Sequence, residues 1–461
     1  MEDSLINIGS KAVEAAIEAN SDQADAFLTR TYCVVVEVEK GSSKHAYTVS
    51  DEGVSVKSVC RGSVGFSYAT TLETKDVIKT ATSAVAEAKA GTTDPEFKSL
   101  PKPQKTPTVK GIYDKAAVEA DPADFIDVAV QLAESQRIDK RIYSVNSAIR
   151  CGWQQIAVVN SLGVEYEDKS TLVQAEGEAI AKERGEMSSG FEFQSSRWLR
   201  EIDPSRIGRT AGEYAARSLH RKKIKTATLP VVVDSIAASY IFLRSIMDGA
   251  SAENIQYKRS YLCGKLGKKI GSRKLTIIDD GTNPNGVGSF RFDAEGTPSQ
   301  KTTIMEKGVL KNYVYDCYTA GKEGRESTGN AFRVLPSRMF MNYRGTPTIG
   351  VRNLAIKPGK GTVEDLVSEV KDGILLRATW DRPNNSTGEF SGLISDGYKI
   401  EDGEAKYATR QTNMGINMID FFKRIVTVGA DSRQFQSASV GPYCVVSPSI
   451  AIEKAMISGA Q

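Results

Sequence analysis

The sequence changes character at one short run, Leu229-Pro230-Val231-Val232-Val233, which is followed by Asp234-Ser235-Ile236-Ala237-Ala238-Ser239-Tyr240-Ile241-Phe242-Leu243-Arg244. A short apolar run rich in valine is typical of a buried strand. The apolar residues from Ile236 to Met247 then predict a helix. We therefore place a domain boundary just before this run, at about Lys225.

The part before this boundary, residues 1–224, mixes helices with strands. Asp121-Pro122 and Asp203-Pro204 each predict a helix start, because aspartate caps free N–H groups and proline fits the first helical turn. Alternating valines from Val34 to Val59, broken by glycines, predict a strand meander. Prolines among lysines and threonines predict an extended surface connection at residues 92–111. Together these features predict an N-terminal α/β domain.

In the part after the boundary, residues 225–461, apolar runs separated by glycines dominate. Only Val363–Val370 and Ile416–Ile425 predict helices within this stretch. The predicted strands are Leu275–Ile278, Val309–Tyr315, Met339–Tyr343, Ile374–Thr379, Tyr398–Ile400, Val440–Val446 and Ile450–Ile457. This order predicts an α+β fold, with the N-terminal α/β domain followed by a largely antiparallel β C-terminal domain.

The composition argues against several classes of protein. Sixty Lys and Arg against 57 Asp and Glu leave a net charge of +3, and the two signs are interspersed, so nothing here indicates nucleic-acid binding. No run approaches the ~18 to 20 apolar residues that cross a bilayer. The start, Met1-Glu2-Asp3-Ser4, does not resemble a secretory signal. We expect a cytoplasmic protein without membrane contact.

Three polar runs in the second half carry groups capable of chemistry or binding. The first is Asp279-Asp280-Gly281 followed by Phe292-Asp293-Ala294-Glu295-Gly296-Thr297-Pro298. Four carboxylates around two tight turns suit a hard cation such as magnesium or calcium. Acids in such positions also cap backbone N–H groups. Both interpretations stay open.

The second run is Ser327-Thr328-Gly329-Asn330-Ala331, and the third is Asn384-Asn385-Ser386-Thr387-Gly388-Glu389-Phe390-Ser391-Gly392. Small polar residues leave backbone groups accessible, as a peptide-binding cleft or sheet edge requires, and ordinary β-turns explain them equally well. The candidate site residues of the three runs are Asp279, Asp280, Asp293, Glu295, Gly296, Ser327, Thr328, Gly329, Asn330, Asn385, Thr387 and Gly388.

Taken in order, these runs resemble one known family, TldD/PmbA. The resemblance rests on Leu275-Thr276-Ile277-Ile278-Asp279-Asp280, Phe292-Asp293-Ala294-Glu295-Gly296, Gly308-Val309-Leu310, Thr319-Ala320, Ser327-Thr328-Gly329-Asn330-Ala331, Thr387-Gly388-Glu389-Phe390-Ser391-Gly392, Gly397-Tyr398-Lys399-Ile400-Glu401-Asp402-Gly403-Glu404 and Val428-Gly429-Ala430-Asp431. The N-terminal half agrees more loosely, through Asp51-Glu52-Gly53-Val54-Ser55-Val56 and Arg61-Gly62-Ser63-Val64-Gly65-Phe66. The resemblance implies a two-domain fold and a role in proteolysis.

One motif of that family is missing. Its catalytic members, the TldD type, resemble zinc peptidases with a His-Glu-x-x-x-His helix and a cysteine ligand from near the C-terminus. The corresponding helix here, after Val233, has no histidine, and the whole chain has only His45 and His220. Cys444 lies near the expected cysteine, but one thiol does not hold a catalytic zinc. The resemblance therefore implies a TldE (PmbA)-type subunit with no catalytic residue, metal ligand or cofactor of its own.

For such a subunit the resemblance implies a TldD-like metallopeptidase partner that brings the zinc. The two chains, or two copies of this chain as a homodimer, would enclose a chamber that holds an unfolded peptide as an added β-strand. Two alternatives stay open. One is a homodimeric hydrolase whose site uses the acidic residues with a hard cation, or a cysteine nucleophile such as Cys444. The other is a non-enzymatic regulatory binding protein.

Overall fold

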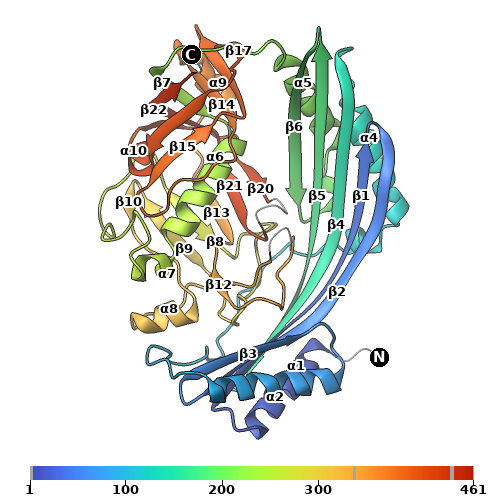
Figure 1. The fold of residues 1–461 in the computed structure, drawn as a ribbon, viewed down its shortest axis with the longest axis vertical. Coiled ribbons are helices and arrows are strands. Elements are labelled where there is room, and N and C mark those ends of the chain that lie inside the picture. The colour runs from blue at the N-terminus through green and yellow to red at the C-terminus, as the bar shows by residue number, and fades with distance from the viewer. Residues whose placement is uncertain (1–3, 336–338, 437–440, 460–461) are drawn as a thin grey trace.

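The computed structural model describes residues 4–335, 339–436 and 441–459. The protein has a mixed α+β fold with mostly antiparallel strands, which confirms the predicted class. Figure 1 shows a long, twisted N-terminal sheet beside the shorter-stranded sheets formed by the C-terminal half. Among the described residues, no helix has both the length and the apolar character needed to cross a membrane.

The N-terminal sheet has six antiparallel strands in the order β3-β2-β1-β4-β5-β6. Its strands are β1 (Gln23–Glu39), β2 (Ser42–Cys60), β3 (Ser63–Ala69), β4 (Ile142–Asn160), β5 (Glu165–Glu183) and β6 (Glu186–Ser196). Four of them have 17 to 19 residues, against the usual length of about 5 to 6. One continuous sheet therefore runs along most of the long axis of the molecule (Figure 1).

The helices of this half cover the sheet on the face away from the C-terminal half, and at its lower end (Figure 1). They are α1 (Leu5–Glu18), α2 (Thr74–Ala90), α3 (Lys115–Glu119), α4 (Pro122–Glu134) and α5 (Pro204–Arg217). The side chains of Asp121 and Asp203 accept N–H groups at the starts of α4 and α5, as predicted. Residues 92–111 contain no helix or strand and connect α2 with α3.

In the C-terminal half, β7 (Ala227–Val233) is the predicted buried strand, parallel to β14 and antiparallel to β22. Its sheet has the order β15-β18-β22-β7-β14-β16-β17, with β19 also on β22, and the second sheet has the order β10-β9-β8-β13-β21-β20. The remaining strands are β8 (Ile277–Asp280), β9 (Lys301–Glu306), β10 (Val309–Leu310), β11 (Ala331–Phe332), β12 (Thr348–Ile349), β13 (Asn353–Ile356), β14 (Asp372–Ala378), β15 (Glu389–Leu393), β16 (Asp396–Glu401), β17 (Glu404–Ala408), β18 (Asn413–Asn417), β19 (Ile425–Val428), β20 (Arg433–Phe435), β21 (Cys444–Ser447) and β22 (Ile450–Ser458).

The helices of this half are short. They are α6 (Ser235–Phe242), continued by a π-helical turn (Leu243–Met247), then α7 (Ala252–Gln256), α8 (Cys317–Lys322), α9 (Val363–Ser368) and α10 (Met418–Lys423). The helix predicted after Val233 and those predicted near 363 and 416 are present, whereas α7 and α8 were not expected from the sequence.

The prediction of a strand at Met339–Tyr343 is wrong, because these residues form no strand. The side chain of Gln154 takes both backbone groups of Met341, accepting from its N–H at 3.3 Å and donating to its carbonyl at 2.6 Å. These residues therefore pair with a side chain of the N-terminal sheet, and not with a neighbouring strand. In the strand predicted at Val440–Val446, Val440 lies outside the described residues, and the observed strand is β21.

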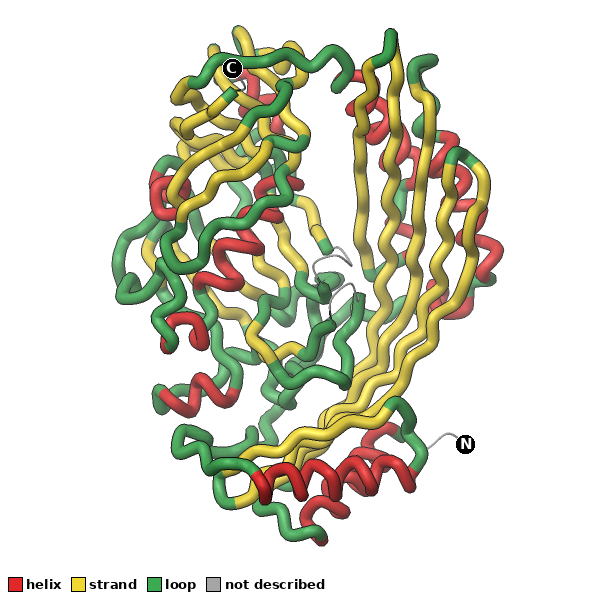
Figure 2. Tube along the Cα trace, in the orientation of Figure 1, coloured by secondary structure: helices red, strands yellow, loops and turns green. Residues whose placement is uncertain are grey.

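One hydrophobic core joins the two halves. Phe27, Ile156 and Val158 of the N-terminal sheet belong to the same buried cluster as Val233 and Phe292 of the C-terminal half. Figure 2 shows loops of the C-terminal half lying against the lower part of the long strands. This packing leaves the upper part of the inner face of the sheet free to line a pocket.

Candidate functional site

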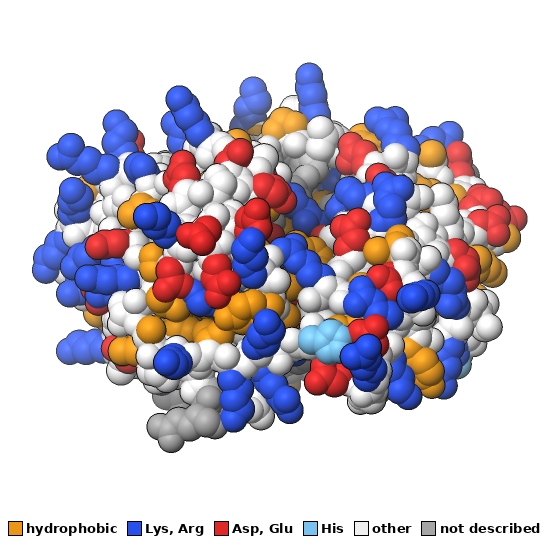
Figure 3. Space-filling view, turned by 90° about the horizontal axis from the view of Figure 1, so that it is seen from above, with side chains coloured by type: hydrophobic (Ala, Val, Ile, Leu, Met, Phe, Trp, Pro, Cys, Tyr) orange, Lys and Arg blue, Asp and Glu red, His pale blue; other side chains and the backbone are white. Residues whose placement is uncertain are grey.

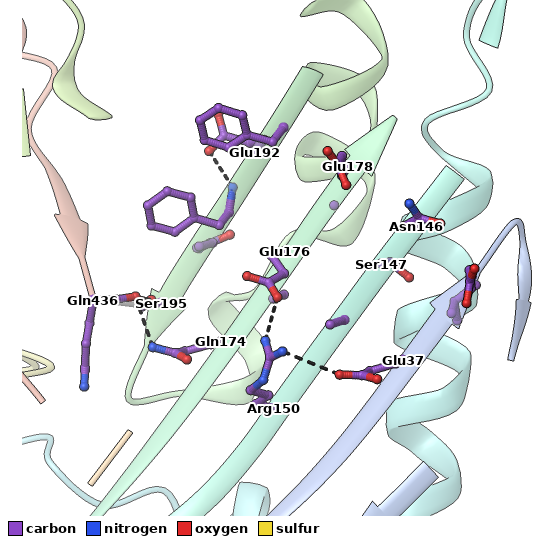
Figure 4. Close-up of a pocket in the computed structure, with 18 of the residues that line it drawn as sticks. Glu37, Asn146, Ser147, Arg150, Gln174, Glu176, Glu178, Glu192, Ser195 and Gln436 are labelled. Atoms are coloured by element: carbon purple, nitrogen blue, oxygen red, sulfur yellow. Dashed lines mark hydrogen bonds and ion pairs between the residues drawn. The ribbon is translucent and has the colours of Figure 1, made fainter. Parts of the chain in front are cut away.

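A pocket of about 630 Å³ lies between the upper part of the N-terminal sheet and the C-terminal half (Figure 4). Strands β1, β4, β5 and β6 supply most of its lining, and Trp380 and Gln436 come from the C-terminal half. Ligand clefts commonly have volumes of about 300 to 1,000 Å³. We call this pocket the glutamate cleft because five glutamates line it: Glu37, Glu39, Glu176, Glu178 and Glu192.

Strand geometry brings these glutamates together. Side chains two residues apart on a strand point to the same face, so Glu37 with Glu39 and Glu176 with Glu178 share the inner face of the sheet. The register places Glu37 opposite Ala148 and Ala148 opposite Glu176, in one row across three strands. Carboxylates 139 residues apart in sequence, from position 37 to position 176, thereby line one cleft.

Arg150 offsets part of this negative charge. Its Nη1 lies 2.7 Å from Glu176 Oε1, and its Nη2 lies 3.7 Å from Glu37 Oε1. Figure 4 shows the guanidinium between the two carboxylates. Lys44, on the lining beside Glu39, forms an ion pair with that residue.

Glu192 is the buried member of the group. It lies 2.6 Å from Arg433 Nη2 and 3.5 Å from Arg377 Nη2, both from the C-terminal half. Burial alone would raise the pKa of Glu192, but the two guanidinium groups hold this pKa below its ordinary value. Glu192 is therefore a charged anchor between the two halves of the molecule.

Aromatic side chains form another part of the wall. Trp380 is 50% exposed, and its ring centroid lies 5.4 Å from that of Phe191 on β6. On its other side, Trp380 meets Tyr240 of α6 edge to face at 5.5 Å. An exposed tryptophan in a lined pocket is typical of a surface that binds a ligand.

The structure brings the first two predicted runs together in a buried network. Asp279 accepts hydrogen bonds from the Asn330 side chain at 2.6 Å and from the Arg352 backbone N–H at 2.8 Å. Asp293 accepts three backbone N–H groups, from Glu295, Thr297 and Ala331. Burial raises the pKa of Asp279 to about 6, and burial together with neighbouring Glu295 raises that of Asp293 to about 7. Both carboxyl groups hold turns in place.

Glu295 connects this network to the N-terminal sheet. Its Oε1 lies 3.4 Å from Lys57 Nζ, and its Oε2 accepts the Cys317 N–H at 2.8 Å. The same ammonium lies 2.9 Å from Asp25. Burial alone would lower the pKa of Lys57, but Asp25 and Glu295 hold it above its ordinary value.

Gly296 and Gly329 are required by the backbone. Their φ angles are +87° and +70°, in the left-handed region that favours glycine. A Cβ atom would lie 2.7 Å from Val164 at Gly296 and 2.7 Å from the Pro298 carbonyl oxygen at Gly329. These two glycines therefore serve tight packing in this network.

The remaining residues of these runs make local contacts. Thr328 Oγ1 donates to Asn330 Oδ1 at 2.7 Å, and Asp280 Oδ1 accepts the Thr282 N–H at 2.9 Å. Ser327 lines a second pocket, of about 300 Å³. Within residues 4–335, 339–436 and 441–459, no three His, Cys, Asp or Glu side chains are arranged to hold a metal ion.

The third predicted run lies apart from this network, in the turn before β15. The Asn385 carbonyl accepts the Tyr261 N–H at 2.7 Å, and the Thr387 carbonyl accepts from Asn417 at 3.1 Å. Gly388 packs on the Tyr261 ring. None of the twelve predicted residues is among those that line the glutamate cleft. Their role in a peptide chamber stays a prediction.

Sequence reasoning missed the glutamates of the cleft. The available signal was their spacing of two, at 37 and 39 and again at 176 and 178. That spacing shows which residues share a face, but it does not show which strands are neighbours or how they are aligned.

Two family models match most of the chain. A model of the PmbA/TldA metallopeptidase C-terminal domain matches residues 226–459, and a model of the central domain matches residues 95–219. The chain belongs to the PmbA/TldD family. The resemblance noted in the motifs is thereby confirmed.

Relatives of this PmbA/TldD-family chain match it nearly from end to end. An uncharacterized protein of Methanocaldococcus jannaschii is 28% identical over 92% of this chain and 93% of its own length. A metalloprotease TldD homolog of Buchnera aphidicola is 26% identical over 95% of this chain and 93% of its own length. TldE from Thermococcus kodakarensis has the same fold, with a TM-score of 0.88 at 23% identity, over 98% of this chain and 99% of that chain.

The segment at which the motif resemblance predicts the zinc helix of catalytic PmbA/TldD members forms α6 with its π turn. Asp234 caps it by accepting the Ile236 N–H at 2.9 Å, and burial raises the pKa of Asp234 to about 6. The segment has no histidine, and it reaches the glutamate cleft through Tyr240, which packs on Trp380.

The two histidines and Cys444 of this PmbA/TldD-family chain lie outside α6 and its π turn. His220 Nε2 lies 2.5 Å from Glu183, at the hairpin end of β5, and His45 is exposed on β2. Cys444 is fully buried, and burial raises the pKa of its thiol to about 12. Because the thiolate is the form that attacks carbonyl groups and binds metals, the surroundings of Cys444 oppose both roles.

Proposed function

We propose that this chain is the peptide-binding, non-catalytic subunit of a TldD/TldE-type metallopeptidase assembly. One observation carries the proposal. The segment that corresponds to the family's zinc helix has no histidine, yet it still borders an open cleft through the Tyr240–Trp380 contact. This combination suits a chain that holds a substrate while a partner supplies the metal.

The shape and lining of the cleft support a peptide as the ligand. The cleft combines aromatic walls with charged and amide groups and follows the inner face of β1, β4, β5 and β6. On the edge of β6, the carbonyls of Phe191 and Phe193 already accept hydrogen bonds from Arg377 and Arg433. We therefore place an extended peptide over the face of the sheet within the cleft, and not along this edge of β6.

The partner in this proposal is a TldD-like subunit that carries the family's zinc. Two relatives named as metalloproteases, one a TldD homolog and one PmbA itself, support a place in such a system. A second copy of this chain is the other partner that the sequence allows. We place the assembly in the cytoplasm, with zinc held by the partner alone.

The test is to purify the chain alone, and together with a TldD-type partner encoded in the same genome, and to measure cleavage of an unfolded peptide. We expect no cleavage by the chain alone and chelator-sensitive cleavage by the assembly. Zinc analysis by mass spectrometry should find metal only when the partner is present. Chelator-sensitive cleavage by the isolated chain, with stoichiometric zinc, would contradict the proposal.

The alternative of a hydrolase with its own site has weaker support. Asp279 and Asp293 already accept hydrogen bonds within the buried network, and the Cys444 thiol has a raised pKa. A regulatory protein that contacts DNA also has weak support. Figure 3 shows acidic and basic side chains interspersed on the face seen from above, whereas DNA-binding surfaces are typically basic throughout.

A further inference from the structure

The glutamate cleft has an excess of negative charge. Glu192 is already paired with Arg377 and Arg433. Among the other described residues that line the cleft, four glutamates against the cations Lys44 and Arg150 leave an excess of two carboxylates. A cleft lined by one sign of charge raises the local concentration of ligands with the opposite sign. The excess therefore favours a cationic ligand.

Among the residues that the structure describes, the other four carboxylates of the cleft have an ion-pair partner and Glu178 has none. Glu37 and Glu176 share Arg150, Glu39 pairs with Lys44, and Glu192 pairs with arginines of the C-terminal half. Glu178 is exposed, and no cation of the described chain lies within ion-pair distance of it. It is the carboxylate available to a ligand.

The register brings this carboxylate next to the aromatic wall. Glu178 on β5 lies directly opposite Phe191 on β6, and such opposite residues have Cβ atoms about 4.5 to 5.5 Å apart. The Phe191 ring in turn contacts the half-exposed ring of Trp380. One cationic group of a ligand can therefore lie on the aromatic face and contact the carboxylate beside it at the same time.

Gln436 is a buried residue at the wall of the cleft, and its backbone carbonyl accepts hydrogen bonds from Gln174 and Ser195. Gln436 lines the cleft and is only 3% exposed, yet its Oε1 has no hydrogen-bond partner in the part of the chain that the structure describes. Its Nε2 is already used, donating to the Met339 carbonyl at 3.1 Å.

We propose that the glutamate cleft selects peptides with lysine or arginine side chains, and that Glu178 and Trp380 receive the charged group. Both side chains present several N–H donors and no acceptor, which complements a carboxylate. The inference rests on the proposed function, because it concerns which peptides the chain binds.

The test uses three labelled peptides of equal length, with lysine, glutamine or glutamate at the same positions. Fluorescence anisotropy measures their binding to the full-length chain, alone and with its TldD-type partner. We expect the lysine peptide to bind about tenfold more tightly than the glutamine peptide and the glutamate peptide to bind most weakly. Added salt should reduce the difference, because charges in an open cleft are screened.

Two variants locate the preference. Glu178→Gln and, separately, Trp380→Leu should each reduce the preference for lysine over glutamine several-fold. The matched control is Glu165→Gln, an exposed glutamate at the other end of the same strand, outside the cleft, which should leave the preference unchanged. Circular dichroism melting of all three variants checks that each is folded.

The outcomes separate the two proposals. Equal binding of the lysine and glutamine peptides would overturn the preference for cations while supporting peptide binding. If Glu165→Gln reduced the preference for lysine over glutamine as much as Glu178→Gln, the cleft would not be the site that recognises lysine. Absence of binding for all three peptides, with and without the partner, would overturn the proposed function itself and this inference with it.

Discussion

At the scale of single residues, buried carboxyl groups make this protein sensitive to pH. Asp234, which caps α6, has a pKa raised to about 6 because burial disfavours its charged form. The ordinary pKa of aspartate is about 3.9. A carboxyl group whose pKa is higher in the folded state stabilises the fold at low pH, and this contribution is lost as the pH rises through about 6.

The expected consequence is a fall in the free energy of unfolding as the pH rises from about 4 to about 7. The share of Asp234 is on the order of 2 kcal/mol, since one pKa unit corresponds to about 1.4 kcal/mol. Asp234→Asn keeps an oxygen that caps the helix but does not titrate. Urea unfolding at several pH values should therefore show a smaller fall in the variant.

Other buried aspartates also have raised pKa values, among them Asp279, Asp293 and Asp316. They titrate in both proteins, so the difference between wild type and Asp234→Asn isolates one group. An identical pH dependence in the two proteins would show that Asp234 is already charged at low pH in the folded state.

At the scale of elements, the long sheet depends on close approach of helix backbones. Gly190 on β6 faces α5, and a Cβ atom there would lie 2.2 Å from the Ala215 nitrogen and 2.4 Å from the Ala211 oxygen. The obstructing atoms belong to the backbone, so they cannot rotate away. A larger residue at 190 must push α5 off the sheet.

Gly190→Ala should therefore lower the free energy of unfolding by about 3 kcal/mol, at the upper end of typical overpacking costs. The matched control is Gly415→Ala on β18, where the nearest atom, Met456 Cβ, would lie 3.9 Å away. This control should be neutral or slightly stabilising. Thermal melting of both variants makes the comparison, and equal melting temperatures would contradict the packing argument.

The elements also show where local sequence signals suffice. The Asp-Pro pairs at 121 and 203 begin α4 and α5 because capping involves only neighbouring residues. The predicted strand at Met339–Tyr343 is absent because Gln154, far away in sequence, takes the backbone groups of Met341. Apolar alternation shows that a segment is buried, but not which groups satisfy its backbone.

At the scale of the whole molecule, a buried ion cluster ties the two halves together. Lys57 from the N-terminal sheet lies between Asp25 and Glu295, and Arg333 from the C-terminal half reaches Asp25 at 3.3 Å. The side chains of Asp25 and Glu295 are at most 5% exposed. Removing the ammonium leaves these carboxylates with too little compensating charge.

Lys57→Met should therefore destabilise the protein by about 3 kcal/mol, as expected when one member of a buried ion pair is lost. Lys44→Met removes a lysine from the exposed ion pair with Glu39 on the same sheet and should change stability little. Chemical unfolding followed by tryptophan fluorescence measures both variants. Similar unfolding midpoints for the two would show that the cluster does not hold the halves together.

The sequence by itself determined the fold class, the capped helix starts, the family motifs and the absence of histidine after Val233. These properties depend on residue type and on neighbours a few positions apart, so they can be read along the chain. The same reasoning placed the chemistry of the chain in the acidic and glycine-rich runs of the second half.

Only the tertiary structure showed that Asp279 and Asp293 accept backbone N–H groups and that Glu295 pairs with a lysine. It also showed that other glutamates line the open cleft. The physical reason is strand register. Glu37, Arg150 and Glu178 come together only because β1, β4 and β5 pair in one particular alignment. That alignment is set by packing across the whole sheet and not by the residues beside each glutamate.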